Sequence, residues 1–321
     1  MTVDPYNLAA PRWLHVLAVL TVLFTLPLLF LGAGVTSHDV GMVDPRGFRP
    51  PWEIVKGLFE NDGLAWRLEY GHRTLGFLVG VCGIGLAVGC WFFDRRSWMG
   101  WLGFLALTMI CIQGALGIYR VNLDALFGRG LALIHGAFAQ IVFATLVAVA
   151  LFTSRRWMNV PSEPASPAVA RWSIVTAVIV FAQLLLGGLV RHQQDSILGP
   201  RGHLLGAFLV VGAVVWLLKL MRESETSSQF KVQRISLMIL LALQLWLGVE
   251  SWLARFFVAT AANQQAIMPM PTHAEWIRTA HYLVGTLIFA TSVTVVLIAN
   301  RKPVAVVEAV TERPRQLEGA L

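Results

Sequence analysis

Long runs of apolar residues, separated by short polar stretches, dominate the hydropathy pattern of this chain. A helix needs roughly 20 mostly apolar residues to cross about 30 Å of hydrocarbon. Eight runs reach this length, at approximately residues 13–34, 72–93, 100–119, 131–152, 172–190, 203–221, 235–254 and 279–299. Transmembrane β-strands would be about half as long and would alternate apolar with polar residues. The pattern therefore predicts an all-α integral membrane protein with eight transmembrane helices.

Composition also indicates a membrane protein, and it argues against a nucleic-acid-binding protein and a disulfide-stabilised protein. Of the 321 residues, 56% are hydrophobic and 13% are charged, whereas soluble proteins carry about 25% charged residues. The net charge of +7 does not indicate a nucleic-acid partner, because the lysines and arginines are dispersed between the apolar runs. Cys82, Cys90 and Cys111 all lie inside apolar runs, so we expect no structural disulfide. The expected surroundings are the lipid bilayer.

The distribution of positive charge predicts the orientation. If the N-terminus is cytoplasmic, 14 of the 25 lysines and arginines lie on the inner side and 11 on the outer side. Positive charge is enriched in cytoplasmic loops, so we expect a multi-pass protein of the cell inner (plasma) membrane with both termini in the cytoplasm. The tail from Lys302 onward is charged and lacks an apolar face, which predicts disorder.

The two halves of the chain repeat each other, which indicates an internal duplication. Corresponding residues, at offsets of 131 to 155 positions, are Gly71-His72 with Gly202-His203, Gln113 with Gln244, Leu116-Gly117 with Leu247-Gly248, His135 with His281, and Leu31-Gly32 with Leu186-Gly187. A segment rich in proline and serine, residues 153–171, lies between the halves and is the predicted linker. We expect two pseudo-symmetric four-helix bundles, at residues 1–160 and 161–321.

Four histidines are the main candidates for chemistry, since each opens an even-numbered predicted helix at the end expected to face outward. They are His72, His135, His203 and His281. Ionisable side chains at membrane depth are costly and usually functional. One such histidine would often only bond a neighbouring helix, but two duplicated pairs at one depth favour a shared function.

Heme fits this pattern better than zinc does. Heme iron takes an axial nitrogen from each side, and the flat macrocycle fits between the helices of a bundle. Zinc is less suited, because the histidines have no cysteine partner and no HxxxH or HExxH spacing. Arginines within six residues of these histidines are candidate partners of the heme propionates, or else simple interface anchors. They are Arg73, Arg129, Arg201 and Arg278.

Glu69 distinguishes the two halves. It precedes His72 by three residues, so both side chains share one face of a helix. A glutamate there could simply complement the helix dipole, or it could orient the imidazole and handle protons as a catalytic group. The segment before His203 has no acid at the equivalent position. This asymmetry predicts two cofactors with different tasks.

These residues resemble the heme A synthase family (Cox15/CtaA) over essentially all eight predicted helices. The resemblance rests on Glu69-Tyr70-Gly71-His72-Arg73, Gly34-Val35-Thr36-Ser37, Val43-Asp44-Pro45, Gln113-Gly114-Ala115-Leu116-Gly117, Tyr119-Arg120-Val121, His135, His203 and His281. Many bacterial members carry a cysteine pair in the first outer loop, whereas residues 35–71 here contain no cysteine. We therefore expect function without a disulfide in that loop.

The resemblance implies a specific reaction and division of labour. In the family, the C8 methyl group of heme O is oxidised to the formyl group of heme A, which serves terminal oxidases. His72 and His135 would bracket this substrate heme with assistance from Glu69, and His203 and His281 would ligate a resident heme b. Heme O would be the binding partner, with heme O synthase and terminal oxidase assembly factors as further candidates. The oligomeric state stays open.

Two other classes remain as alternatives. A diheme b-type membrane cytochrome that only transfers electrons would need the four histidines, yet it would have no use for Glu69 in one half alone. Such cytochromes usually place their hemes at different depths, which the four histidines do not suggest. A repeat-built transporter would have helix breaks at matching positions of both halves, but Pro27 has no counterpart in the fifth predicted helix. Activity on heme O separates these classes.

Overall fold

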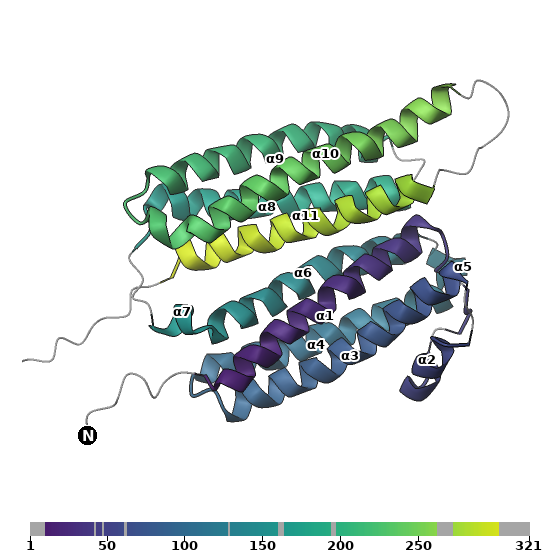
Figure 1. Cartoon of the computed structure of the whole chain (residues 1–321), viewed down its shortest axis with the longest axis horizontal. Helices are drawn as coiled ribbons and strands as arrows, with labels where there is room; N and C mark the ends of the chain where they lie inside the picture. The colour runs from purple at the N-terminus through teal and green to yellow at the C-terminus, as the bar shows by residue number, and fades with distance from the viewer. Residues whose placement is uncertain are drawn as a thin grey trace, which may run out of the picture.

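The computed structural model describes residues 10–41, 43–46, 48–60, 63–127, 129–159, 164–193, 197–261 and 272–301. This part of the chain contains helices and no strands, and eight helices are long and apolar enough to cross a membrane. Figure 1 shows them as α1 (Arg12–Ser37), α3 (Leu64–Phe92), α4 (Ser97–Asn122), α6 (Gly130–Thr153), α8 (Pro167–His192), α9 (Leu198–Glu223), α10 (Lys231–Ala261) and α11 (Thr272–Ala299). The predicted all-α membrane class is confirmed.

Short helices fill the connections. They are α2 (Pro51–Gly57), α5 (Asp124–Phe127), α7 (Arg155–Asn159) and the 3₁₀ helix η2 (Ser227–Phe230). The helix α2 starts with a proline, a residue that suits the first helical position because its missing N–H has no partner there. None of these short helices was predicted, since the apolar runs locate only segments that cross the bilayer.

Several predicted boundaries were wrong. The helix α11 begins at Thr272, so His281 lies more than two turns inside it instead of opening it. The helix α3 begins at Leu64, so His72 lies two turns inside it instead of opening it; residues 64–71 mix polar and aromatic side chains and therefore fall outside an apolar run. The predicted linker 153–171 is also partly helical. It contains α7 and the start of α8 at Pro167, where Ser166 accepts a capping hydrogen bond from the N–H of Val169. The tail from Lys302 lies outside the described residues.

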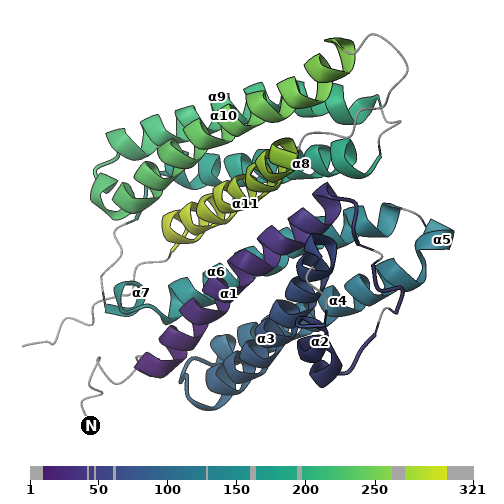
Figure 2. The same cartoon turned by 45° about the vertical axis from the view of Figure 1, so that its right-hand side comes forward.

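The eight long helices form two groups of four (Figures 1 and 2). One group contains α1, α3, α4 and α6, and the other contains α8, α9, α10 and α11. The groups meet where α1 and α6 pack against α11 and where α6 packs against α8. This arrangement is consistent with two pseudo-symmetric bundles.

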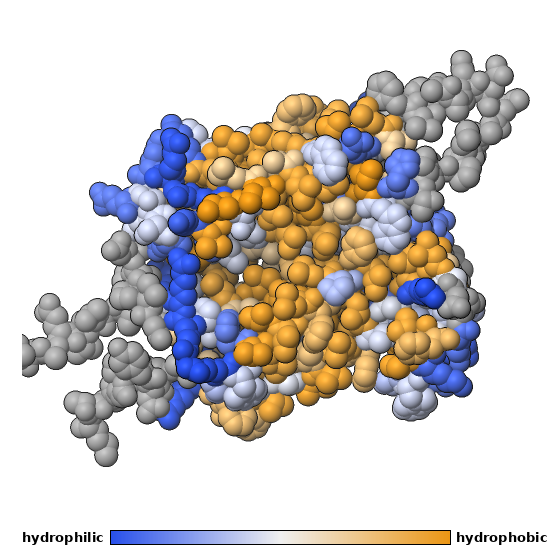
Figure 3. Space-filling view, in the orientation of Figure 1, coloured by the Kyte–Doolittle hydropathy of each residue, from blue (hydrophilic) through white to orange (hydrophobic). Residues whose placement is uncertain are grey.

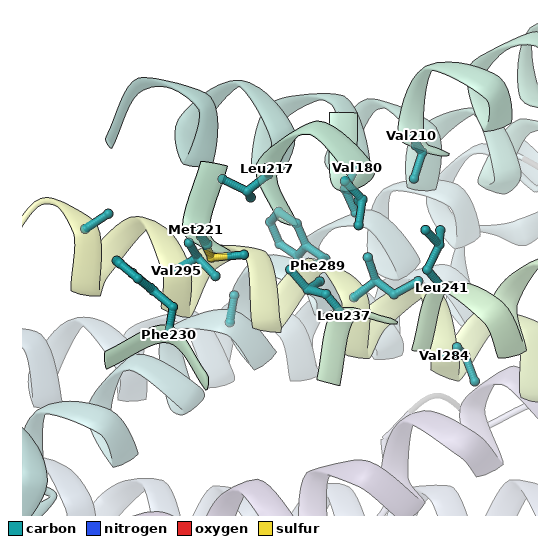
Figure 4. Packing of buried hydrophobic residues seen from close by; sticks show 14 of the residues in the cluster. Val180, Val210, Leu217, Met221, Phe230, Leu237, Leu241, Val284, Phe289 and Val295 are labelled. Atoms are coloured by element: carbon teal, nitrogen blue, oxygen red, sulfur yellow. The ribbon is translucent and has the colours of Figure 1, made fainter. Parts of the chain in front are cut away.

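Each group has its own apolar core. In the second group, Leu217, Leu237 and Phe289 converge from α9, α10 and α11 (Figure 4). A smaller cluster joins the groups, with Leu29 of α1 and Phe143 of α6 buried together with Ala290 of α11. Within a bilayer, such close packing is a main source of helix association, because lipid tails are as apolar as leucine.

The surface carries the signature of a membrane protein. Figure 3 shows a broad apolar belt with hydrophilic residues at either end. Large apolar side chains of the long helices, such as Trp101 of α4 and Phe208 of α9, are exposed, as expected for side chains that face lipid. The start of α1 and the end of α11 lie at the same end of the molecule, and α2 and α5 lie at the opposite end (Figure 1).

Candidate functional site

The four predicted histidines come together as two pairs, one in each group of helices. The ring centroids of His72 on α3 and His135 on α6 lie 6.5 Å apart, with their planes at 77°. The ring centroids of His203 on α9 and His281 on α11 lie 6.1 Å apart, with their planes at 80°. Histidines 63 and 78 positions apart in the chain are therefore neighbours in space.

These separations fit an iron atom between two imidazoles. Metal–nitrogen bonds of about 2 Å, added to about 1.1 Å from each nitrogen to its ring centre, would place the centroids about 6.2 Å apart. Among the described residues, no cluster of three or more His, Cys, Asp or Glu side chains could hold a metal ion. Each pair thus offers two imidazoles, which is the donor set of a six-coordinate heme.

Each imidazole packs against a glycine of the preceding long helix. An added Cβ would lie 2.6 Å from the His72 ring at Gly32, 3.2 Å from His135 at Gly117, 3.0 Å from His203 at Gly187, and 3.2 Å from His281 at Gly248. A side chain at Gly32 would clash with the His72 ring, and at the other three glycines the imidazole would have to shift by a few tenths of an ångström. The Leu-Gly pairs that repeat along the sequence are therefore explained by the close approach of four helices to four imidazole rings.

Three glutamines lie one turn before these glycines and contact three of the histidines. The Nε2 atom of Gln113 lies 3.2 Å from Nδ1 of His135 and also donates to the backbone carbonyl of His135 at 3.1 Å. Gln183 donates to the backbone carbonyl of His203 at 2.8 Å. The Nε2 atom of Gln244 lies 3.2 Å from Nε2 of His281.

His72 is the exception. The corresponding position of α1, four residues before Gly32, is Leu28. Its backbone carbonyl lies 3.0 Å from Nδ1 of His72. Donation from Nδ1–H to this carbonyl leaves Nε2 as the nitrogen that can bind a metal.

Glu69 is buried one turn before His72 on α3 and anchors the first loop. Its carboxylate pairs with Arg73 at 2.5 Å and accepts a 2.9 Å hydrogen bond from the backbone N–H of Val43. Arg73 in turn donates to the backbone carbonyls of Arg46 and Asp44. Glu69 and Arg73 therefore both bind the loop that follows α1.

Asp44 is the second buried carboxylate of this loop. It accepts hydrogen bonds from the hydroxyl of Tyr70 at 2.6 Å and from Nε of Arg49 at 2.5 Å. Burial by itself lowers the pKa of the Arg49 guanidinium, but the hydrogen bond to Asp44 and the nearby charges raise that pKa above its ordinary value. Arg49 therefore stays charged and keeps Asp44 paired.

The other predicted arginines have different surroundings. Arg129 is half exposed, and its Nη2 lies 3.5 Å from the carboxylate of Asp39. Arg278 donates to the backbone carbonyl of Ser37 at 3.2 Å. Arg201 is exposed on α9.

One arginine at the junction of the two groups was missed by sequence reasoning. Arg191 of α8 donates to the carbonyl of Ala33 and, at 2.6 Å, to the hydroxyl of Ser37 on α1. Its guanidinium also lies 5.3 Å from the ring of Tyr282. Gln183 was also missed, although a signal for it existed. Gln113 and Gln244 were identified in the repeat, and Gln-x-x-x-Gly occurs in three of the four odd-numbered predicted helices.

The described cysteines are all free. Cys82 and Cys90 are buried, whereas Cys111 is exposed on the surface of α4. The position of Cys111 within an apolar run does not by itself indicate which face of the helix it occupies.

Comparisons with known proteins match part of this chain. The family COX15-CtaA, described as a cytochrome oxidase assembly protein, matches residues 57–200, which include Glu69, His72 and His135. The chain is 30% identical over 222 residues to a heme A synthase of Methylorubrum populi, a match that covers 59% of this chain and 56% of that protein. It is 27% identical over 191 residues to a heme A synthase of Alkalihalophilus pseudofirmus, covering 57% of this chain and 61% of that protein.

The chain thus spans less than two thirds of the length of either curated relative. No solved structure matches it. The family match covers the N-terminal histidine pair and Glu69, and both relatives carry the same name. Residues 57–200 of the chain are therefore similar to the COX15-CtaA family.

Proposed function

We propose that this protein is a heme A synthase, a membrane oxidoreductase that oxidises the C8 methyl group of heme O to the formyl group of heme A. The observation that carries the proposal is the spacing of the two histidine pairs. In each pair, the distance between the ring centroids suits two imidazoles that would bind one heme iron. The names of the two relatives support the same activity.

The two pairs have different tasks in this proposal. The N-terminal half, residues 1–160, holds heme O as substrate between His72 and His135. The C-terminal half, residues 161–321, holds a resident heme b between His203 and His281. A heme bound there would supply one-electron redox chemistry.

The residues of the chain supply binding, orientation and proton handling. Conversion of a methyl group to a formyl group adds one oxygen atom and, with water as its source, releases four protons and four electrons, so the reaction needs an external electron acceptor. A carboxylate beside the substrate pair can accept protons. Glu69 is the proposed catalytic residue, because it is buried one turn from His72 and the C-terminal half has no equivalent acid. By holding Val43 and Asp44, it also keeps the first loop over that end of α3.

The four arginines are proposed to bind the heme propionates. Arg73, Arg129, Arg201 and Arg278 all lie near the histidine-bearing end of their helices. We propose that the protein resides in the inner (plasma) membrane with both termini in the cytoplasm. Heme O synthase and terminal oxidase assembly factors are its proposed protein partners.

The test is the chemical product. The chain is expressed in membranes that contain heme O and lack any other heme A-forming enzyme, and the extracted hemes are identified by mass and chromatography. We expect heme A with the wild type and only heme O with His72→Ala. Protein that holds heme in both sites yet yields no formyl heme would instead be an electron-transferring cytochrome.

A further inference from the structure

Three glutamines lie beside the histidines that are proposed to bind heme, although they are not themselves proposed ligands. Gln113, Gln183 and Gln244 each lie four residues before a glycine that contacts an imidazole ring. Each amide nitrogen contacts the histidine of the next long helix, either at its ring or at its backbone carbonyl. Gln113 and Gln244 thus reach the imidazole ring, whereas Gln183 reaches only the backbone carbonyl of its histidine.

The amide oxygens of these glutamines are buried and have no hydrogen-bond partner among the described atoms. The Nδ1 atoms of His203 and His281 are also buried and have no hydrogen-bond partner among the described atoms. A buried polar atom without a partner is unfavourable, and an amide carries both a donor and an acceptor. A rotation that exchanged the amide nitrogen and oxygen of Gln113 or Gln244 would place the oxygen against the ring of His135 or His281, where it could accept a hydrogen bond. Gln183 contacts His203 only at its backbone carbonyl.

Such a hydrogen bond has a known consequence for a metal ligand. The hydrogen bond made by one ring nitrogen of a histidine fixes the tautomer and orientation of the ring and so determines how the other nitrogen binds metal. At His72 this task falls to the backbone carbonyl of Leu28. No side chain is needed there, which accounts for a leucine at the position that is glutamine in the other three helices.

We propose that Gln113, Gln183 and Gln244 are positioning residues that fix His135, His203 and His281 as heme ligands. This inference rests on the proposed function, because it takes the histidines as ligands. It adds a difference between the halves: both ligands of the C-terminal site depend on a glutamine, whereas the N-terminal site depends on one glutamine and one backbone carbonyl.

The test measures the resident heme of purified full-length protein in detergent. Gln183→Leu and Gln244→Leu install the residue that α1 carries at position 28, and both should lower heme b affinity about 10- to 100-fold. Gln140→Leu is the matched control, since this buried glutamine of α6 donates to the hydroxyl of Tyr282 instead of a histidine. The control should keep wild-type affinity.

A conservative variant separates positioning from simple packing. Gln244→Glu keeps the length and an acceptor oxygen, so it should retain heme, and its carboxylate should make His281 more basic and lower the midpoint potential of heme b. If the leucine variants do not fold, Gln244→Asn, which withdraws the amide by one carbon, should show the same loss of affinity.

The outcomes distinguish this inference from the proposed function. Unchanged heme affinity in the leucine or asparagine variants, or an unchanged potential in Gln244→Glu, would overturn the positioning role while heme binding itself stands. Wild-type protein that binds no heme, or a His203→Ala variant that binds as much heme as the wild type, would overturn the proposed function as well.

Discussion

The hydroxyl of Tyr70 on α3 donates a 2.6 Å hydrogen bond to Asp44, which lies 26 positions earlier in the chain. This bond and the Glu69 contacts fasten the first loop to the helix that carries His72. The loop is thereby fixed beside the proposed substrate site. Its attachment consists of buried charged and polar groups with no cysteine.

Removal of the Tyr70 hydroxyl tests this attachment. Tyr70→Phe should lower the free energy of unfolding by about 1.5–3 kcal/mol, because a buried hydrogen bond to a charged acceptor is lost. Thermal unfolding in detergent would measure the loss, and limited proteolysis should cut the loop faster. Tyr119→Phe is the control, since Tyr119 is 55% exposed. Equal stability of both variants would mean that the Asp44 contact does not hold the loop.

The glycine contacts lead to a second prediction. Gly32→Ala should push the ring of His72 out of place, because the added Cβ would lie 2.6 Å from it. We expect loss of heme A formation while the C-terminal heme b is retained. Gly80→Ala on α3 has open space at its Cβ, and it should be neutral or stabilising because alanine favours a helix over glycine by roughly 0.5–1 kcal/mol. Wild-type heme A formation by Gly32→Ala would contradict the close packing of Gly32 against the His72 ring.

Arg191 should contribute to the joint between the two groups of helices. Arg191→Met keeps the apolar stem but removes hydrogen bonds from a charged donor to Ala33 and Ser37. We expect a loss of about 1.5–3 kcal/mol in the free energy of unfolding, measured by denaturant titration. The exposed Arg201 gives the matched control, Arg201→Met, which should lie within about 0.5 kcal/mol of the wild type. If both variants lost similar amounts of unfolding free energy, the Arg191 contacts would not stabilise the junction between the two groups.

The orientation in the membrane is a separate prediction. Reporter fusions at residues 160–163 and after residue 321 should both give cytoplasmic signals, because the charge balance of the loops favours an inner N-terminus. The ends of α1 and α11 on one side of the molecule agree with an even number of crossings (Figure 1). A periplasmic signal from either fusion would reverse the side on which the histidine pairs lie.

Much of this arrangement could be predicted from the sequence, because the bilayer imposes strong constraints. Apolar runs located all eight long helices, since a crossing helix must be long and apolar. The duplicated histidines correctly suggested pairs, and the structure places each pair within 6.5 Å. The pattern could not locate the start of α3, where residues 64–71 are helical without being uniformly apolar.

The contacts around the histidines were harder to predict. Repetition identified Gln113 and Gln244, but only the packing of α4 on α6 and α10 on α11 shows that they reach His135 and His281. Glu69 was expected to act on His72 through helical spacing, yet its oxygens bind Arg73 and the loop backbone. Contacts across a loop depend on tertiary structure, which spacing along one helix does not encode.

The division of labour between the histidine pairs is the central claim, and the heme content of purified variants tests it most directly. His203→Ala and His281→Ala should each remove the tightly bound heme b, since each leaves one axial ligand for that iron. His72→Ala and His135→Ala should keep that heme b and fail to form heme A. The opposite pattern, or equal loss of heme b from all four variants, would contradict the assignment of the resident heme to the C-terminal pair.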